Sequence, residues 1–257
     1  MDRSGQTMDS LTLIVITKNE AGRIERCLRS VPFASQIVVV DSGSTDGTVA
    51  IASSLGAHVV QTQEWPGFGV QKNRALSLAT CDWVLSLDAD EYLSEELQRE
   101  IFSVLQSSEV QVFRFPRSSS YFGRFMRYSG WYPDYVTRLF RRGQARFSDD
   151  LVHERLIVDG KVGTLRANLM HESFRAAEDV LTKLNAYSTA GAQKMYAEGR
   201  RSSLTQAVFR GCWAFFRTYV LQMGFLDGRR GFLLAVSNAE GTYYRYVKLW
   251  LIGQDQS

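Results

Sequence analysis

The chain has 257 residues, of which 45% are apolar and 22% are charged, and this balance excludes a disordered protein and allows a full-sized hydrophobic core. Its net charge of +3 is too small to indicate nucleic-acid binding, although it suits an anionic substrate or a membrane surface. The cysteines Cys27, Cys81 and Cys212 lie far apart, which predicts neither a disulfide framework nor a zinc site. A polar N-terminus and the lack of an uncharged apolar run of about 18 residues predict a cytoplasmic protein without a transmembrane helix.

Strand and helix patterns alternate from Leu11 onwards. Apolar, β-branched runs predict strands at Leu11–Thr17, Ile37–Val40, His58–Thr62 and Trp83–Leu87. Helical spacing predicts helices over Ala21–Ser30, Thr48–Leu55 and Gln71–Ala79. This alternation is typical of a parallel sheet flanked by helices, in which ligands bind beyond the carboxyl ends of the strands. We therefore expect Thr17, Asp41 and Asp88 to edge one crevice.

Three carboxylates, Asp88, Asp90 and Glu91, directly follow the last of these strands. Carboxylates so close together repel one another unless a positive group neutralises them. Asp88 and Asp90 are two apart in an extended segment, so they point the same way and can share one divalent cation. Water or a substrate diphosphate would fill its other positions. The pattern predicts metal-assisted transfer from a phosphate-activated donor; the alternative is a solvated acidic loop.

A second polar group follows the second predicted strand. Asp41 can hydrogen-bond a nucleoside base or ribose, and the glycines of the turn Ser42–Gly47 allow close backbone approach. The next helix N-terminus favours anions. The alternative is a simple turn with a capped helix, in which Thr45 or Asp46 is the N-cap. Because the first turn, Lys18–Glu20, has no glycine triplet, a Rossmann dinucleotide site is disfavoured.

The middle of the chain is rich in aromatic residues. From Ser94, a predicted N-cap, a helix is expected to run to Leu105, and a strand is expected at Val110–Phe115. Residues 117–146 are then crowded with aromatic and arginine side chains, which stack on sugar rings and pair with phosphate or carboxylate. We interpret this segment as the acceptor half of the site; the alternative is a partly structured surface loop.

Asp149–Glu154 is a further polar segment, and one of its carboxylates could deprotonate an acceptor hydroxyl. Val158–Leu169 predicts a hairpin. His171, which follows it, could complete the metal shell through a ring nitrogen. The alternative for a lone histidine is a surface or hydrogen-bonded structural residue.

The C-terminal part is predicted to be helical at Val180–Ala197, Leu204–Met223 and Phe232–Ile252, with a basic turn at Gly224–Gly231. Basic residues beside aromatic and aliphatic ones suit helices in a membrane interface. The alternative is a helical pair packed on the sheet domain or on a second subunit. We expect a catalytic domain over residues 1–175, with a donor half at about 10–92 and an acceptor half at about 93–175, and a helical extension over 176–257.

Four segments of the first hundred or so residues carry a resemblance to a known family. They are LTLIVITKNE, VVVDSGSTDGT, FGVQKNRAL and LSLDADE, and together they resemble the family 2 glycosyltransferases of the GT-A fold. The later segments VHERL, LMHESF and GFLDGRRGF are similar to the subgroup that contains the lipopolysaccharide inner-core β-1,4-glucosyltransferases. The resemblance implies a Rossmann-like nucleotide-binding mixed sheet flanked by helices.

The resemblance also implies roles for individual residues. Those implied for the nucleotide-sugar site are Thr17, Glu20, Asp41, Lys72, Asn73, Arg74 and Asp88. Those implied for the metal, Mg²⁺ or Mn²⁺, are Asp90 as principal ligand, His171 and Asp88. For the catalytic base, many members carry a Glu-Asp pair where this chain has His153-Glu154, so Glu154 is expected first and Asp150 second.

The implied reaction is an inverting, metal-dependent transfer of a hexose, glucose by resemblance, from a UDP-sugar. The implied acceptor is a saccharide of lipopolysaccharide core or a related lipid-linked glycan, with possible peripheral association at the inner membrane face. A sugar nucleotidyltransferase and a catalytically inactive binding protein are the alternatives. The inactive protein is expected to lack Asp88 or Asp90, and both are present.

Overall fold

The computed structural model describes residues 9–148, 155–158 and 160–254. The chain divides into two compact units. The first contains the residues up to Arg117 together with Asp134–His171, and the second contains Ser118–Pro133 together with the residues from Glu172 onwards. The segment Ser118–Pro133 therefore belongs to the same unit as the C-terminal helices.

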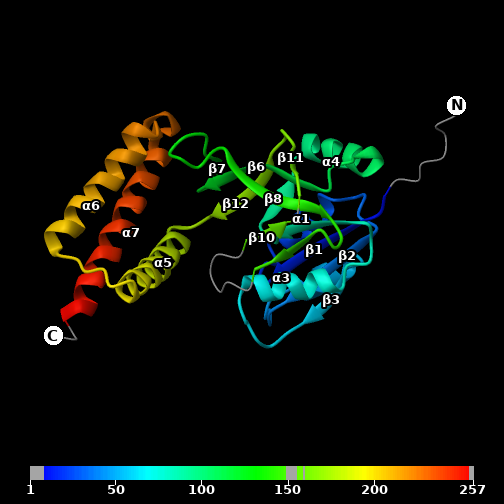
Figure 1. Ribbon diagram of the computed structural model, residues 1–257, viewed down its shortest axis with the longest axis horizontal. Helices are drawn as coiled ribbons and strands as arrows, with labels where there is room; N and C mark the ends of the chain where they lie inside the picture. The colour runs from blue at the N-terminus through cyan, green and yellow to red at the C-terminus, as the bar shows by residue number, and fades with distance from the viewer. Residues whose placement is uncertain (1–8, 149–154, 159, 255–257) are drawn as a thin grey trace, which may run out of the picture. The chain divides into compact units, whose positions relative to one another are not determined.

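A mixed sheet forms the first unit. Its strand order is β3 (His58–Gln61), β2 (Gln36–Asp41), β1 (Leu11–Thr17), β4 (Trp83–Asp88), β8 (Asp134–Arg141), β6 (Val112–Tyr121), β12 (Leu169–Phe174) and β5 (Glu91–Leu93) (Figure 1). The first four strands are parallel, whereas β8 is antiparallel to β4 and to β6. Every residue of β1 is buried, which explains its continuous apolar run. The predicted mixed α/β fold is confirmed.

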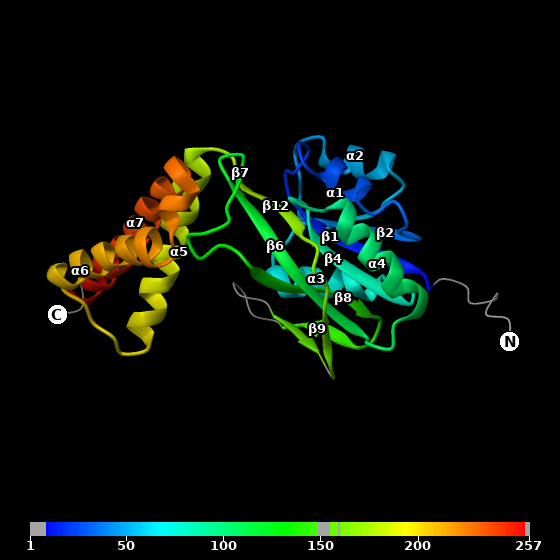
Figure 2. The same cartoon turned by 90° about the horizontal axis from the view of Figure 1, so that it is seen from above.

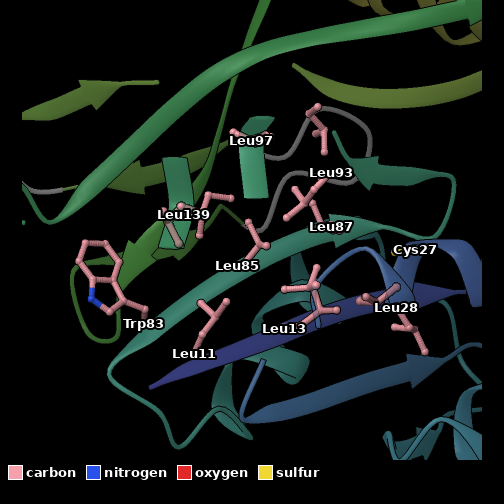
Figure 3. Packing of buried hydrophobic residues seen from close by; sticks show 14 of the residues in the cluster. Leu11, Leu13, Cys27, Leu28, Trp83, Leu85, Leu87, Leu93, Leu97 and Leu139 are labelled. Atoms are coloured by element: carbon pink, nitrogen blue, oxygen red, sulfur yellow. The ribbon is translucent and has the colours of Figure 1, made fainter. Parts of the chain in front are cut away.

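Helices cover both faces of the parallel strands (Figure 2). The helices α1 (Ile24–Arg29), α2 (Thr48–Ser54) and α4 (Glu95–Ser107) pack on one face, and α3 (Phe68–Ser77) packs on the other. Figure 3 shows Leu13 of β1, Leu87 of β4 and Leu28 of α1 in the first of these cores. Burial of each such side chain contributes roughly 1.5–3 kcal/mol. The Ser94 hydroxyl accepts a hydrogen bond from the Leu97 amide, so the predicted N-cap of α4 is confirmed.

The hairpin expected at Val158–Leu169 is wrong. The strand β10 (Leu156–Val158) instead pairs antiparallel with β9 (Ala145–Phe147), and β11 (Val162–Thr164) pairs in parallel with β6. A Cβ on Gly163 would lie 2.6 Å from the Phe113 ring, so glycine is what lets β11 approach β6. Of the two short strands, β10 pairs with the strand just before it and β11 with one distant in sequence. The local alternation pattern reveals neither choice of partner.

The described second unit contains β7 (Arg124–Phe125), α5 (Ala177–Ala197), α6 (Leu204–Phe216), the π-helical turn η1 (Arg217–Leu221), the 3₁₀ turn η2 (Gly224–Asp227) and α7 (Gly228–Gln254). Ala192 and Met195 of α5 pack on Leu249 of α7, and Phe215 of α6 packs edge-on against Phe232 of α7. The predicted helical extension is confirmed. No helix among the described residues is long and apolar enough to cross a membrane.

Candidate active site at the carboxyl edge of the sheet

The carboxyl ends of three parallel strands meet at one edge of the sheet. The register places Thr17 of β1 opposite Asp41 of β2, and Ile16 of β1 opposite Asp88 of β4. These strand ends are therefore neighbours, whereas the crevice that they were expected to edge stays a prediction. The Thr17 hydroxyl is buried and has no hydrogen-bond partner among the described residues, so a ligand atom at this edge would satisfy it.

Two loops beyond β1 and β2 are joined by reciprocal hydrogen bonds. The Asn19 amide donates to the Ser44 hydroxyl, and the Asn19 side-chain carbonyl accepts from the Thr45 amide, both at 2.8 Å. The Asp46 carboxylate accepts from the amides of Ala21 and Thr48. The Thr48 hydroxyl also donates to Asp46, and these hydrogen bonds lower the pKa of that carboxyl. The turn is thereby fixed before any ligand arrives.

Within this turn Asp41 is fully buried. Its carboxylate accepts hydrogen bonds from the amides of Gly43 and Ser44, at 3.1 and 2.9 Å, and from the Ser44 hydroxyl. A carboxylate offers about four lone-pair sites, so capacity for one further donor remains. This geometry is compatible with both alternatives for the turn, namely a simple structural turn and a contact to a nucleoside.

The helix α3 supplies four consecutive polar side chains to the same region. Gln71 is fully buried, and its side-chain NH₂ donates to the hydroxyls of Ser42 and Thr62. Arg74 donates to the Gln71 carbonyl oxygen at 2.7 Å. Between them in sequence, Asn73 donates to the Phe147 carbonyl and accepts from the Phe147 amide, both at 2.9 Å. Asn73 therefore holds β9, whose last residue precedes the segment Ser148–Glu154 by one position.

Asp88 is bound by two cations of the protein itself. One carboxylate oxygen lies 2.9 Å from Lys72 Nζ, and the other lies 2.6 Å from Arg138 Nη2. Burial alone would raise the pKa of Asp88, but Arg138 and Lys72 hold that pKa well below its usual range. Asp88 is therefore ionised at neutral pH.

Glu91 is also neutralised from within the protein. Its side chain is buried, and Oε1 lies 3.2 Å from both Arg117 and Arg138, while Oε2 accepts from the Asp88 amide at 3.0 Å. Arg117 also pairs with Asp134 at 2.6 Å. The premise that these strand-end carboxylates need a metal for neutralisation is therefore wrong for Asp88 and Glu91, because arginine and lysine side chains perform that role.

Asp90 has a different environment. Its Oδ2 lies 3.3 Å from His171 Nε2, and the nearest Arg23 nitrogen is 3.5 Å away. Two cis ligands of an octahedral ion, each at about 2.1 Å, are separated by about 3.0 Å, so this oxygen and nitrogen suit a shared divalent cation. No cluster of three or more His, Cys, Asp or Glu side chains that could hold a metal occurs among the described residues. A metal here would therefore take further ligands from water or from a substrate.

The comparisons with known proteins identify the family. Residues 12–158 match the family model for glycosyl transferase family 2. The chain is also 30% identical, over 252 residues, to the lipopolysaccharide core biosynthesis glycosyltransferase LpsC of Rhizobium meliloti, and the alignment covers 93% of this chain and 92% of the relative. The chain belongs to glycosyl transferase family 2.

A further relative agrees with this assignment, and a solved structure agrees with the fold. The family 2 enzyme is 32% identical to a glycosyltransferase of Rickettsia felis over 260 residues, which cover 94% of this chain and 90% of the relative. The solved structure of S. aureus TarS 1–349 aligns with a TM-score of 0.50 and 15% identity, covering 96% of this chain and 92% of TarS. That likeness concerns the fold, and it agrees with the GT-A type of mixed sheet.

Cys27 of this glycosyltransferase lies beside the acidic edge but does not take part as a thiolate. Its Sγ is 3.6 Å from the Asp88 carbonyl oxygen. Burial, followed by the negative charges of Glu91, Asp90 and Asp88, raises the pKa of the Cys27 thiol well above its usual value. A protonated, buried thiol is a poor nucleophile and a poor metal ligand.

The expected catalytic bases of the glycosyltransferase, Glu154 and Asp150, lie outside the described residues. Of the expected donor-site residues, Lys72 and Asp88 are brought together, whereas Glu20 pairs with Arg23 at 3.1 Å. The sequence analysis counted Arg138 among the arginines of the acceptor half and missed its pairing with Asp88 and Glu91. Its signal was an arginine inside the apolar strand β8, because a charge at a buried strand position requires a partner.

Proposed function

We propose that this family 2 glycosyltransferase transfers a hexose, glucose in the first instance, from a UDP-sugar to a saccharide acceptor with inversion. The observation that carries the proposal is the pairing of Asp90 with His171 beside an edge formed by Thr17, Asp41 and Asp88. Such an edge of a parallel sheet is where nucleotides bind in α/β proteins. In this proposal, a divalent cation held by Asp90 and His171 supplies the positive counter-charge that the donor diphosphate requires.

The donor's nucleoside would lie against the two joined loops. Asp41 retains capacity for one donor, such as a uracil N–H, and Thr17 has an unsatisfied hydroxyl among the described residues. Lys72 is buried on α3 and oriented by Asp88. In this proposal Asp88 holds Lys72 and Arg138 in place, and these cations contribute positive potential near the diphosphate.

A divalent cation, Mg²⁺ or Mn²⁺, would be held by Asp90 and His171, with Asp88 as the more distant candidate because both its oxygens already pair with cations. When bound, such an ion supplies positive charge for the leaving diphosphate. Asp90 directly precedes β5, and His171 lies in β12 opposite Glu91 of β5. The pairing of these two strands therefore positions both side chains.

The base would come from Ser148–Glu154, with Glu154 the first candidate and Asp150 the second. It would remove the acceptor hydroxyl proton as the oxygen attacks the anomeric carbon from the face opposite the departing UDP. Asn73 supports this role by its two hydrogen bonds to Phe147 at the end of β9. The acceptor proposed is a saccharide of lipopolysaccharide core, because LpsC, whose name states that process, aligns over most of the chain.

We also propose that the enzyme associates peripherally with an anionic membrane surface in the cytoplasm. One face of α6 presents Val208, Phe209, Trp213 and Phe216, which are 44–78% exposed. Arg229 and Arg230 follow at the start of α7. Apolar and aromatic side chains beside basic ones favour an interfacial helix.

The decisive experiment on the reaction measures products from UDP-glucose and truncated core oligosaccharide, with and without EDTA. UDP release that depends on acceptor and divalent metal is expected, and Asp90→Ala should lose at least about two decades of kcat. Glu96→Ala, whose side chain is 67% exposed, is the matched control. Release of pyrophosphate would instead favour the nucleotidyltransferase, and near-wild-type turnover of Asp90→Ala would exclude the metal assignment.

The base and the membrane surface have separate tests. Glu154→Gln should lower kcat by roughly 10²–10⁴-fold if Glu154 is the base; a smaller loss moves the role to Asp150. Flotation with anionic vesicles should be lost when both Phe209 and Trp213 are replaced by serine. Leu181→Ser, at an equally exposed position of α5, should float as wild type does.

A further inference from the structure

The second unit contains a cavity of about 430 Å³, a volume within the range of small-molecule sites. It lies among α5, η1, α7 and the segment Ser118–Pro133, and it takes no lining residue from the first unit. Its walls combine aromatic rings with polar and basic side chains. Tyr121 and Trp131 belong to the segment 117–146 that the sequence analysis assigned to the acceptor half, whereas the donor, metal and base assignments above use none of the lining residues.

Three of the lining side chains are cationic, namely Lys183, Arg217 and Arg245, and no Asp or Glu is among the described residues that line the cavity. Within the described part of the chain, none of the three forms an ion pair with a carboxylate. Like charges gathered around one cavity are unfavourable without a counter-charge. This cavity therefore differs from the acidic edge of the sheet, where the protein supplies its own counter-charges.

Arg245 shows this deficit most directly. Its Nε is buried and has no hydrogen-bond partner among the described residues. The side chain lies against Gly191 of α5, where an added Cβ would be 2.8 Å from that Nε. Glycine is unfavourable inside a helix, and at this position its absent side chain is what gives Arg245 its place in the wall. A ligand acceptor in the cavity would satisfy the guanidinium.

Arg217 belongs to η1, a π-helical turn between α6 and η2. Such turns are rare and occur frequently at functional sites. The neighbouring loop is held firmly, because Ser129 donates its amide to the Gln222 carbonyl and its hydroxyl to the Asp227 carboxylate. Arg217 and the loop that contains Ser129 both line the cavity, and these hydrogen bonds hold the loop in place.

Aromatic rings form another wall of the same cavity. Tyr121, Trp131 and Phe174 lie with ring centroids 5.6–6.1 Å apart. The Lys183 ammonium lies 4.7 Å from the centre of the Phe174 ring. Aromatic faces beside cations suit a ligand that has both a sugar ring and a negative charge.

We propose that this cavity binds an anionic saccharide, that is, a sugar carrying a phosphate or carboxylate group. Arg217, Arg245 and Lys183 pair with the anionic group, and the sugar ring packs on the aromatic wall. The inference concerns binding by the second unit alone, so it holds whether or not the donor and metal assignments of the first unit are correct.

The test is calorimetric titration of the full chain, without nucleotide or metal and at fixed ionic strength. The probes are glucose 6-phosphate, glucuronate, glucose and inorganic phosphate. The two anionic sugars should bind, glucose should not, and phosphate should bind more weakly than glucose 6-phosphate. Arg217→Met and Arg245→Met should each weaken binding by roughly tenfold or more, because charge-assisted hydrogen bonds are lost.

Matched variants make the outcome decisive. Arg200→Met removes the same charge from an exposed position that does not line the cavity, and it should bind as wild type does. Trp131→Leu should weaken the binding of glucose 6-phosphate but leave that of phosphate unchanged. Absence of binding at about 10 mM anionic sugar, or equal losses in Arg217→Met and Arg200→Met, would overturn the proposal. Equal affinity for phosphate and glucose 6-phosphate would overturn the saccharide part of the proposal. Displacement of bound glucose 6-phosphate by anionic lipid vesicles would overturn that part as well.

Discussion

Replacing Arg138 by methionine tests how the acidic strand end is neutralised. Arg138 is 10% exposed and pairs with Asp88 at 2.6 Å and with Glu91 at 3.2 Å. Removing one partner of a buried ion pair destabilises a protein by about 3–5 kcal/mol. Asp88 keeps Lys72 and Glu91 keeps Arg117, so we expect a loss at the lower end of this range, about 3 kcal/mol.

Urea unfolding monitored by tryptophan fluorescence measures this loss. Arg146→Met, an exposed position on β9, is the control and should change the free energy of unfolding by less than about 0.5 kcal/mol. A double-mutant cycle with Glu91→Gln should show coupling, because the two side chains are in contact. EDTA should change the unfolding free energy of wild type little. A loss below about 1 kcal/mol in Arg138→Met, or a large destabilisation by EDTA that persists in Asp90→Ala, would refute neutralisation of Asp88 and Glu91 by the protein's own cations.

Three further predictions concern neighbouring groups. Asn73→Ala leaves both backbone groups of Phe147 unpaired, so it should destabilise the fold by about 2–4 kcal/mol and lower kcat more than it changes KM for the donor, as steady-state kinetics can measure. Asn19 has a φ of 56° and accepts a hydrogen bond from Thr45. Asn19→Ala should therefore lower the free energy of unfolding by about 1–3 kcal/mol. Asn19→Gly should lower it less, because glycine adopts the left-handed conformation without strain. The pKa of Asp88 is lower in the folded state than its unfolded value of about 3.9; its ion pairs therefore stabilise fully above that pH and are lost only as the pH falls further. Unfolding free energy should consequently decline more steeply below about pH 4 in wild type than in Asp88→Asn.

The parallel half of the fold could be predicted because its signals are local. The strands β1, β2 and β4 are buried on both faces, so their apolar runs identify them directly. Polar residues at the ends of these strands then identify the edge at which ligands bind. The hairpin was wrong because β10 pairs with the preceding strand β9, and β11 pairs with β6, which lies far back along the chain. Short strands carry no local mark of which partner they take.

The electrostatics of the site could be predicted only in part. The carboxylates Asp88, Asp90 and Glu91 are visible in one short segment, but their counter-charges come from Arg117 and Arg138, which are distant in sequence. A sum of local charge therefore overestimates the need for a metal. The remaining candidate for a cation site is the separate pair of Asp90 and His171, which also lie far apart in sequence. The sequence analysis assigned both residues to the metal through family resemblance.

A crystal structure with UDP and Mn²⁺ bound would test the central claim most directly. We predict an anomalous manganese signal within about 2.5 Å of both Asp90 Oδ2 and His171 Nε2, with the diphosphate on the same ion and Asp88 still bound by Lys72 and Arg138. Manganese bound away from Asp90 and His171, or UDP lodged away from the ends of β1, β2 and β4, would contradict it.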